Sequence, residues 1–292
     1  MTIFKLKLTL SSSTHTNNHI LLPILPLEIR EQIYSHVIFP EIPEICTTAR
    51  HYITFSCADA IYGGDPRFPC FLHHNLYRVS EDTRIEVCLL FIRYTEIGLM
   101  YPQHTIYFAQ FLCTFPGIEG FGAIRRLDFP LFSRHRPDSG RPNSYIELMQ
   151  RCEGLTEVRV KFEIWYLLMK RLSLFPVNRL TPEELEQQAQ QILDLDRLIV
   201  TYRLDGLLEL PSLTRVTVEV WPRVTVATTS GLKTTMPNGW SVMKGLVEWI
   251  KRGFEERGRD AEVVLLEGGN SGLRWPGPEV VVRRPGMSSS TS

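Results

Sequence analysis

The sequence has no excess of charge and no long apolar run. Its 32 basic and 32 acidic side chains balance over 292 residues, so the surplus of lysine and arginine typical of a general nucleic-acid binder is missing. No run approaches the ~18 apolar residues of a membrane span. Lys5 and Lys7 interrupt the mildly apolar start of the chain, so no secretory leader is expected. We therefore expect an intracellular protein, cytoplasmic or nuclear, that binds neither nucleic acid nor a membrane.

The motifs of common enzyme classes are also missing. The chain contains no G-x-S-x-G, no H-E-x-x-H and no dinucleotide fingerprint. The glycine-rich stretch at 267–272 lacks the lysine of a phosphate-binding loop and is predicted to be a turn. We expect no catalytic activity and no cofactor.

The cysteines do not form the pairs that zinc sites or redox motifs require. None belongs to a C-x-x-C pair, and several sit in apolar runs, which predicts reduced core residues of an intracellular protein. One group of histidines and cysteines has the residue types of a zinc site, but its spacing matches no standard finger. We therefore expect no metal. The six cysteines are Cys46, Cys57, Cys70, Cys88, Cys113 and Cys152, and the histidines of the group are His51, His73 and His74.

The stretch at 25–37, Leu-Pro-Leu-Glu-Ile-Arg-Glu-Gln-Ile-Tyr-Ser-His-Val, predicts a short amphipathic helix. Pro26 suits the first helical position, where its missing N–H costs nothing. Ile29, Ile33 and Val37 recur at i, i+4 and i+8 and form one apolar stripe. Because a helix this short is marginal alone, the stripe must be buried against the rest of the chain, against a partner, or shared between them.

Three stretches in order resemble motifs of F-box-like proteins of a kind common in fungi. The first matches L-P-x-E-I-R-x-x-I-Y-x-x-V. The second, at 75–87, is similar to the L-x-R-V-S/C-x-x-x-R-x-E-A helix of those proteins, and the third, at 124–129, is similar to their I-R-R-L strand. The residues that carry the first match are Leu25, Pro26, Glu28, Ile29, Arg30, Ile33, Tyr34 and Val37.

The resemblance implies a substrate adaptor. In such a protein the F-box docks on the Skp-type adaptor of a cullin–RING ubiquitin ligase, and the remainder holds a protein client, which the sequence does not identify. The contact with the Skp-type adaptor would then be formed by Leu25, Pro26, Ile29 and Ile33.

An alternative remains open, because an ordinary F-box continues directly into two more short helices. Here the segment at 40–69, rich in proline, glycine and β-branched residues, intervenes. The chain could instead be an intracellular scaffold or interaction protein, with a wholly buried F-box-like helix and no ligase role. Solvent exposure of Leu25 and Pro26 distinguishes the two, since a docking residue must be reachable.

The second half predicts an α/β arrangement. Helices at 145–152, 181–202 and 240–254 are followed by strands at 157–164, 215–220 and 262–266, which favours parallel pairing through right-handed crossovers. The segments 154–160 and 211–218 resemble each other and a degenerate leucine-rich-repeat unit, although the spacing is unequal and the usual asparagine is missing. We expect a mixed α+β fold of the α/β class with an irregular layer of helix–strand units.

Four parts are predicted along the chain. They are a strand-like segment and linker at 1–20, an F-box-like helical part with an inserted loop at 21–121, an irregular α/β part at 122–284, and a disordered tail at 285–292. Further elements are expected as strands at 52–55, 99–101, 124–129 and 279–283, helices at 76–91 and 105–115, and a hairpin or loop insertion at 224–235. Arg134, Arg136 and Arg141 share one predicted loop, where they could grip an acidic or phosphorylated peptide or simply remain solvated.

Overall fold

The computed structural model describes residues 24–39, 51–54, 65–67, 69, 75–134, 143–164, 166–167, 194–221, 225–227, 233–235 and 240–268. The predictions for 1–20, for the strand at 279–283 and for the tail lie outside these residues. So do the side chains of the suggested zinc group, and Arg136 and Arg141.

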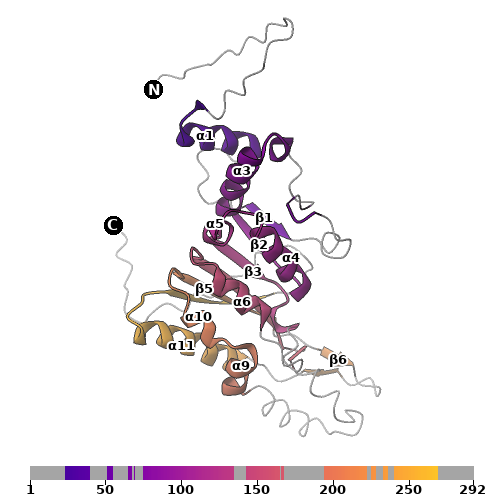
Figure 1. Cartoon of the computed structure of the whole chain (residues 1–292). Helices are drawn as coiled ribbons and strands as arrows, with labels where there is room; N and C mark the ends of the chain where they lie inside the picture. The colour runs from indigo at the N-terminus through magenta and orange to yellow at the C-terminus, as the bar shows by residue number, and fades with distance from the viewer. Residues whose placement is uncertain are drawn as a thin grey trace, which may run out of the picture.

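The fold is built on one six-stranded parallel sheet whose strands follow chain order (Figure 1). Every strand of this sheet pairs in parallel with the strand of the sheet that follows it in the chain. The strands are β1 (His51–Thr54), β2 (Thr95–Gly98), β3 (Arg126–Phe129), β4 (Glu157–Glu163), β5 (Arg215–Trp221) and β8 (Glu262–Glu267). The predicted α/β class with parallel pairing is confirmed.

Helices form the connections, because a parallel strand can be reached only by a crossover. Figure 1 shows them gathered on one side of the sheet, with the helix α1 (Leu27–Ile38) at the end nearest β1. The other helices are η2 (Asn75–Arg78), α3 (Glu81–Tyr94), α4 (Pro102–Leu112), α5 (Glu119–Ala123), η3 (Phe132–Arg134), α6 (Ser144–Arg151), α9 (Leu195–Tyr202), α10 (Asp205–Leu208) and α11 (Trp240–Glu256).

Alternation along the strands gives the sheet one apolar and one polar face. In β4, Val158, Val160 and Phe162 are buried, whereas the charged residues between them are half-buried. The valines of β5 repeat this pattern in register with β4. Since side chains of a strand alternate between faces, the apolar set meets the helices and the charged set lies on the opposite face.

The similar segments 154–160 and 211–218 occupy equivalent places in the fold, each leading into a strand of the sheet. Leu155 and Leu213 are both buried one residue before a backbone ladder that runs across the sheet. In that ladder the N–H of Thr214 donates to the carbonyl of Thr156 (2.9 Å), and the N–H of Thr156 donates to that of Arg125 (2.9 Å). Each turn into a strand is therefore stacked on the turn before it.

An aromatic cluster fills the middle of the core. The ring of Phe132 lies 5.5 Å from those of Tyr145 and Phe162 and 5.6 Å from that of Tyr202. Asn143 fixes this region, since its side chain accepts from the Tyr145 N–H and donates to the Tyr202 carbonyl (2.8 Å). The cluster ties α6 and α9 to the strands.

Some boundaries differ from the predicted ones. The strand expected at 99–101 lies at Thr95–Gly98, because α3 runs on to Tyr94 and the chain enters the sheet directly. Pro102 starts α4 three residues before the predicted helix, as its missing N–H allows. The strands β6 (Thr225–Ala227) and β7 (Lys233–Thr235) pair antiparallel, which favours the hairpin of the two alternatives expected at 224–235. Of the helix expected at 181–202, the structure describes only α9. The sheet continues across the predicted division at 121/122, since β2 pairs with β3.

Truncation of Phe132 should weaken the fold strongly. Phe132→Ala removes a fully buried ring from the aromatic cluster, and we expect it to lower the free energy of unfolding by about 3–5 kcal/mol. Urea denaturation of wild type and variant measures this. Ile118→Ala is the control, because Ile118 is 64% exposed. Equal losses in both variants would contradict the assignment of Phe132 to the core.

His104 should make the fold sensitive to mild acid. Its ring is buried against Tyr101 (centroids 5.2 Å apart), and burial lowers the pKa of His104 below its usual value. The unfolded chain therefore binds a proton more readily than the native state, and stability falls as pH drops through about 6.5 and below. Denaturation at pH 7.5 and 5.5 should show a smaller loss for His104→Gln than for wild type; identical losses would contradict this.

Candidate docking site

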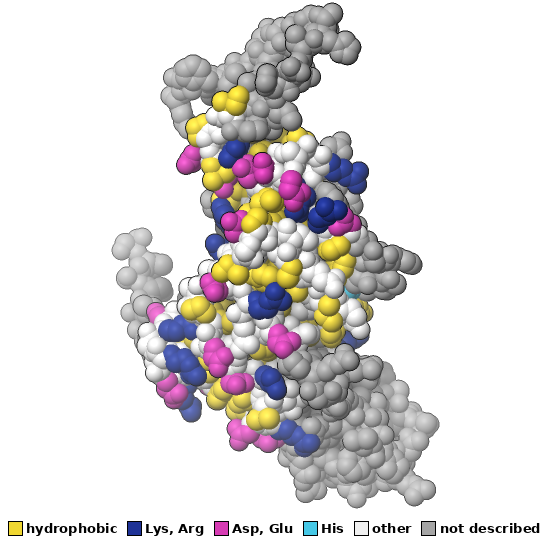
Figure 2. Space-filling model, viewed as in Figure 1, with side chains coloured by type: hydrophobic (Ala, Val, Ile, Leu, Met, Phe, Trp, Pro, Cys, Tyr) yellow, Lys and Arg dark blue, Asp and Glu magenta, His cyan; other side chains and the backbone are white. Residues whose placement is uncertain are grey.

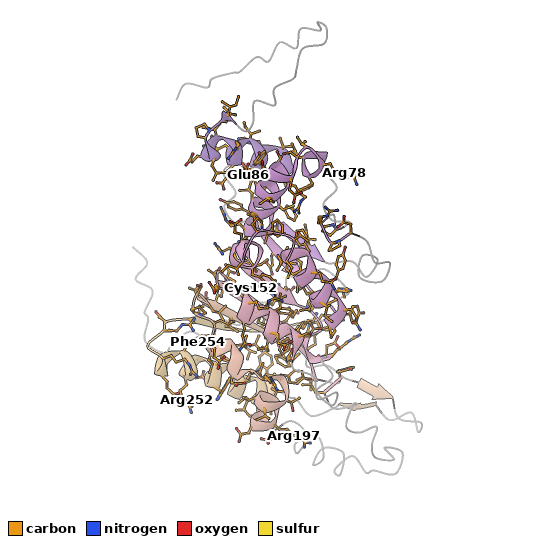
Figure 3. All side chains as sticks on the ribbon, in the orientation of Figure 1. Arg78, Glu86, Cys152, Arg197, Arg252 and Phe254 are labelled. Carbon is orange, nitrogen blue, oxygen red and sulfur yellow. The ribbon has the colours of Figure 1, made fainter. Side chains whose placement is uncertain are left out.

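The helix α1 is held against α3 by one carboxylate that serves two partners. The Nη2 of Arg30 lies 2.8 Å from Glu86 Oε1, and the hydroxyl of Tyr34 donates to Glu86 Oε2 at 3.1 Å. Tyr34 is only 1% exposed. Burial, and then the hydrogen bond to the Glu86 carboxylate, raise the pKa of Tyr34, so the hydroxyl stays a donor. Figure 3 shows Glu86 at the junction of the two helices.

The far end of α1 is fixed by a ring stack. Phe39 follows the helix and lies nearly parallel to Phe91 of α3, with centroids 5.9 Å apart and an interplanar angle of 9°. A weaker and partly exposed pair, Arg93 Nη1 with Glu31 Oε1 at 3.4 Å, also joins the two helices. The position of α1 along α3 is thus set at both ends.

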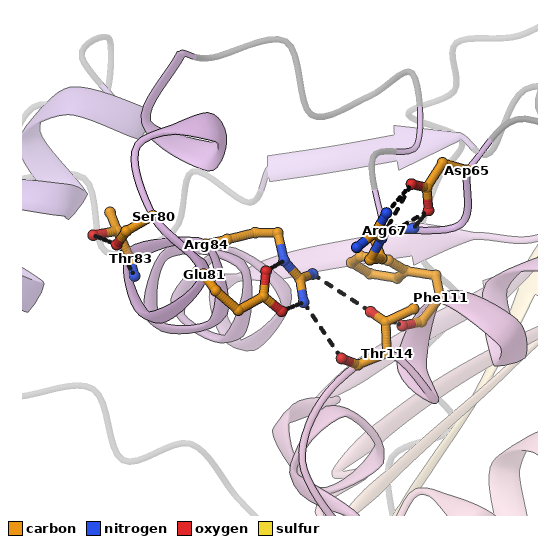
Figure 4. Close-up of polar contacts among 8 residues, drawn as sticks. All are labelled: Asp65, Arg67, Ser80, Glu81, Thr83, Arg84, Phe111 and Thr114. Atoms are coloured by element: carbon orange, nitrogen blue, oxygen red, sulfur yellow. Dashed lines mark hydrogen bonds and ion pairs between the residues drawn. The ribbon is translucent and has the colours of Figure 1, made fainter.

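The helix α3 is in turn anchored to the body of the fold by Arg84, a side chain only 1% exposed. Its guanidinium donates to both oxygens of Glu81 (3.0 and 2.7 Å) and to the Thr114 carbonyl (3.3 Å), as Figure 4 shows. It also lies 5.4 Å from the centroid of the Phe115 ring. Ser80 caps the helix by accepting from the Thr83 N–H (3.1 Å).

None of the four residues predicted to contact a partner belongs to these anchors. Pro26 is exposed, Ile29 is 42% exposed, and Leu25 and Ile33 are half-buried. The predicted stripe of Ile29, Ile33 and Val37 is therefore not the buried side of α1, because the side chain that inserts against α3 is Tyr34. Successive helical residues are rotated by about 100°, so Ile33 falls beside the contact with α3 and Ile29 outside it.

The structure adds two residues to the predicted set. Ile24 is 73% exposed and Leu27 is 48% exposed, and both neighbour Leu25 and Pro26. We define the α1 patch as Ile24, Leu25, Pro26, Leu27, Ile29 and Ile33. Figure 2 shows apolar side chains at the α1 end of the surface. The apolar periodicity did not point to Ile24 or Leu27, because they lie at the helix start, where only local geometry decides exposure.

The inward residues were visible in the motifs but had no assigned role. Arg30 and Tyr34 belong to the first motif, and Arg84 and Glu86 belong to the second. The structure shows that Arg30 and Tyr34 of the first motif bond to Glu86 of the second, and that Arg84 bonds to Glu81 and to the Thr114 carbonyl. Of the apolar positions of the first motif, Leu25, Pro26, Ile29 and Ile33 belong to the α1 patch, and Val37 is half-buried outside it.

The arginine loop is partly accounted for within the chain. Arg134 Nε lies 3.0 Å from Glu163 Oε2 and its guanidinium lies 5.7 Å from the Tyr166 ring centroid. Arg134 is therefore already paired with a carboxylate, which weakens the idea that it grips an acidic peptide.

The polar face of the sheet carries a cluster of Lys161, Glu219 and Trp221, whose side chains contact one another. Lys161 Nζ lies 3.5 Å from the Trp221 ring centroid and 3.6 Å from Glu219 Oε1, and Trp221 Nε1 donates to the same oxygen at 2.7 Å. Burial lowers the pKa of Lys161, and the neighbouring carboxylates oppose that shift. Lys161 and Trp221 thus share one oxygen of Glu219, and the three side chains hold one another.

The described residues include two buried thiols, one exposed thiol and no candidate metal-binding group. Among them no group of three histidine, cysteine or acidic side chains could hold a metal ion. Cys88 and Cys152 are buried free thiols whose pKa burial raises to about 12. The expectation of a buried cysteine is wrong for Cys113, which is exposed at the end of α4.

Comparisons with known proteins leave the site to be judged on its geometry. No protein-family model, curated protein or solved structure matches the chain. Over the part of the chain that the structure describes, no helix combines the length and the apolar character needed to cross a membrane.

The two sides of α1 should respond differently to substitution. Ile29→Asp replaces an exposed side chain, so we expect amide hydrogen exchange across α1 to stay within about twofold of wild type. Tyr34→Ala removes a buried ring and its hydrogen bond, and exchange across α1 should rise at least tenfold. Exchange mass spectrometry of the peptides covering 27–38 tests both. Faster exchange in Ile29→Asp than in Tyr34→Ala would reverse the assignment of the two sides.

Proposed function

We propose that this protein is an intracellular F-box-like interaction adaptor, whose α1 patch docks on the Skp-type adaptor of a cullin–RING ubiquitin ligase. The remaining α/β part would hold a protein client. One observation carries the proposal: α1 is fixed to the fold through Arg30 and Tyr34, while Pro26 and Ile29 remain exposed.

The chemistry of the α1 patch suits a partner surface. Exposed apolar side chains gathered at one site are costly in water and are typical of interaction surfaces. The helix that carries them is already formed and positioned, so a partner need not supply the free energy of ordering it. An apolar groove on the partner would bury Ile29 together with Ile24 and Leu27.

The sheet supports the second half of the proposal. Strands in chain order, stacked turns and a buried leucine before β4 and β5 are features of a leucine-rich-repeat-like layer. The unequal lengths of the connections make it an irregular one. Such layers offer a broad surface on which a client protein could lie.

The alternative is an intracellular scaffold whose F-box-like helix is buried and joins no ligase. It needs the apolar positions of the first motif to lie in the core. The exposure of Pro26 and Ile29 counts against it, whereas the burial of Tyr34 is compatible with both functions.

A pull-down with the Skp-type adaptor tests the proposal. We expect the full-length chain to capture it and Ile29→Asp to lose at least tenfold in affinity, because a charge would enter an apolar interface. Ile118→Asp is the matched control, since Ile118 is also an exposed isoleucine but lies outside the α1 patch.

Two results would contradict the proposal. One is no capture by folded wild-type protein. The other is an equal loss for Ile29→Asp and Ile118→Asp, which would show that any added charge disturbs the complex. Circular dichroism on each variant confirms that the proteins compared are folded.

A further inference from the structure

The carboxylate of Glu86 contacts two side chains one helical turn apart on α1. Oε1 faces Arg30 at 2.8 Å and Oε2 accepts from Tyr34 at 3.1 Å. Residues four apart stand above one another on a helix face. A single carboxylate that holds both therefore fixes the rotation of α1 about its axis, and not only its distance from α3.

That rotation decides where the α1 patch points. Ile29 immediately precedes Arg30, and Ile33 immediately precedes Tyr34, so each lies about 100° around the helix from a residue held by Glu86. If α1 turned by one residue, Glu86 would lose both partners, and the patch would turn by the same angle. The direction of the α1 patch is therefore fixed whenever both contacts of Glu86 are made.

The surroundings make the contact effective. The side chains of Arg30 and Glu86 are 18% and 23% exposed, so solvent screens this pair less than it screens the more open pair of Glu31 and Arg93. Apart from Tyr34, the described part of α1 has no fully buried side chain, and Phe39 follows just beyond its end. Apolar packing alone is therefore a weak determinant of the angle of α1.

From this geometry we infer that Glu86 is a positioning residue for docking: it orients the α1 patch toward its partner without touching that partner. The inference rests on the proposed function. It assigns to Glu86, from the motif at 75–87, a role in docking through the motif at 25–37. Loss of Glu86 leaves α1 attached through Phe39 but distributed over several rotations, of which a fraction is competent to bind. The apparent affinity then falls to that fraction of its wild-type value.

The experiment compares affinities for the Skp-type adaptor by biolayer interferometry on full-length protein. Glu86→Ala removes both contacts and should weaken affinity about tenfold, while Glu86→Gln keeps an acceptor for Tyr34 and should lose less. The exchanged pair Arg30→Glu with Glu86→Arg restores opposite charges and should recover most of the affinity. Recovery by exchange is the result that a merely structural role would not give.

Two controls separate orientation from other effects. Asp82→Asn removes an exposed carboxylate from the same helix and should leave the affinity unchanged. Val264→Ala weakens the core at β8, at the far end of the sheet from α1, and should lower the melting temperature without changing the affinity.

The outcomes are distinguishable. If wild type captures the adaptor, Ile29→Asp does not, and Glu86→Ala binds like wild type, the role of Glu86 is overturned while the proposed function stands. If Val264→Ala loses as much affinity as Glu86→Ala, or the exchanged pair fails to recover, the effect is general destabilisation and the inference is overturned. If folded wild type captures nothing, the proposed function and this inference fall together.

Discussion

The buried guanidinium of Arg84 is the constraint on which the arrangement of the N-terminal part depends. A charged group that is almost wholly removed from water is tolerated only when its donors are satisfied. Here Glu81 and the chain at Thr114 supply the acceptors, so α3 must lie against the end of α4. Glu86, two residues further along the same helix, then faces α1. The helix α3 is therefore fixed to the body of the fold through Arg84 and holds α1 through Glu86.

Regular apolar patterns in the sequence predicted the strands and helices that bury one face against the core. The strands expected at 157–164 and 215–220 are β4 and β5, and the helix expected at 240–254 is α11, whose buried residues lie at helical spacing: Met243, Leu246, Val247, Ile250 and Phe254. These residues are surrounded by core on one side only, so local periodicity and tertiary packing agree. The parallel pairing followed from the alternation of helices and strands.

Prediction failed where a long-range polar contact decided the outcome. Apolar spacing identified Ile29 and Ile33 as a stripe, but it could not show that Tyr34 inserts against α3, because the partner of Tyr34 lies 52 residues away at Glu86. An amphipathic tyrosine can be buried when its hydroxyl finds an acceptor. Likewise Arg134 looked like a free loop cation until folding placed Glu163 beside it.

The order of the strands has a consequence for how such a protein can change over evolutionary time. Each strand of the six-stranded sheet pairs only with the strands of that sheet that come before and after it in the chain, so no later strand of the sheet is inserted between two earlier ones. A helix–strand unit could be duplicated or lost next to β8 without rethreading the chain, as in repeat proteins generally. The sheet could thus lengthen or shorten at β8 while α1 and α3, at the opposite end, keep the same geometry. The two ends of the molecule could diverge at independent rates.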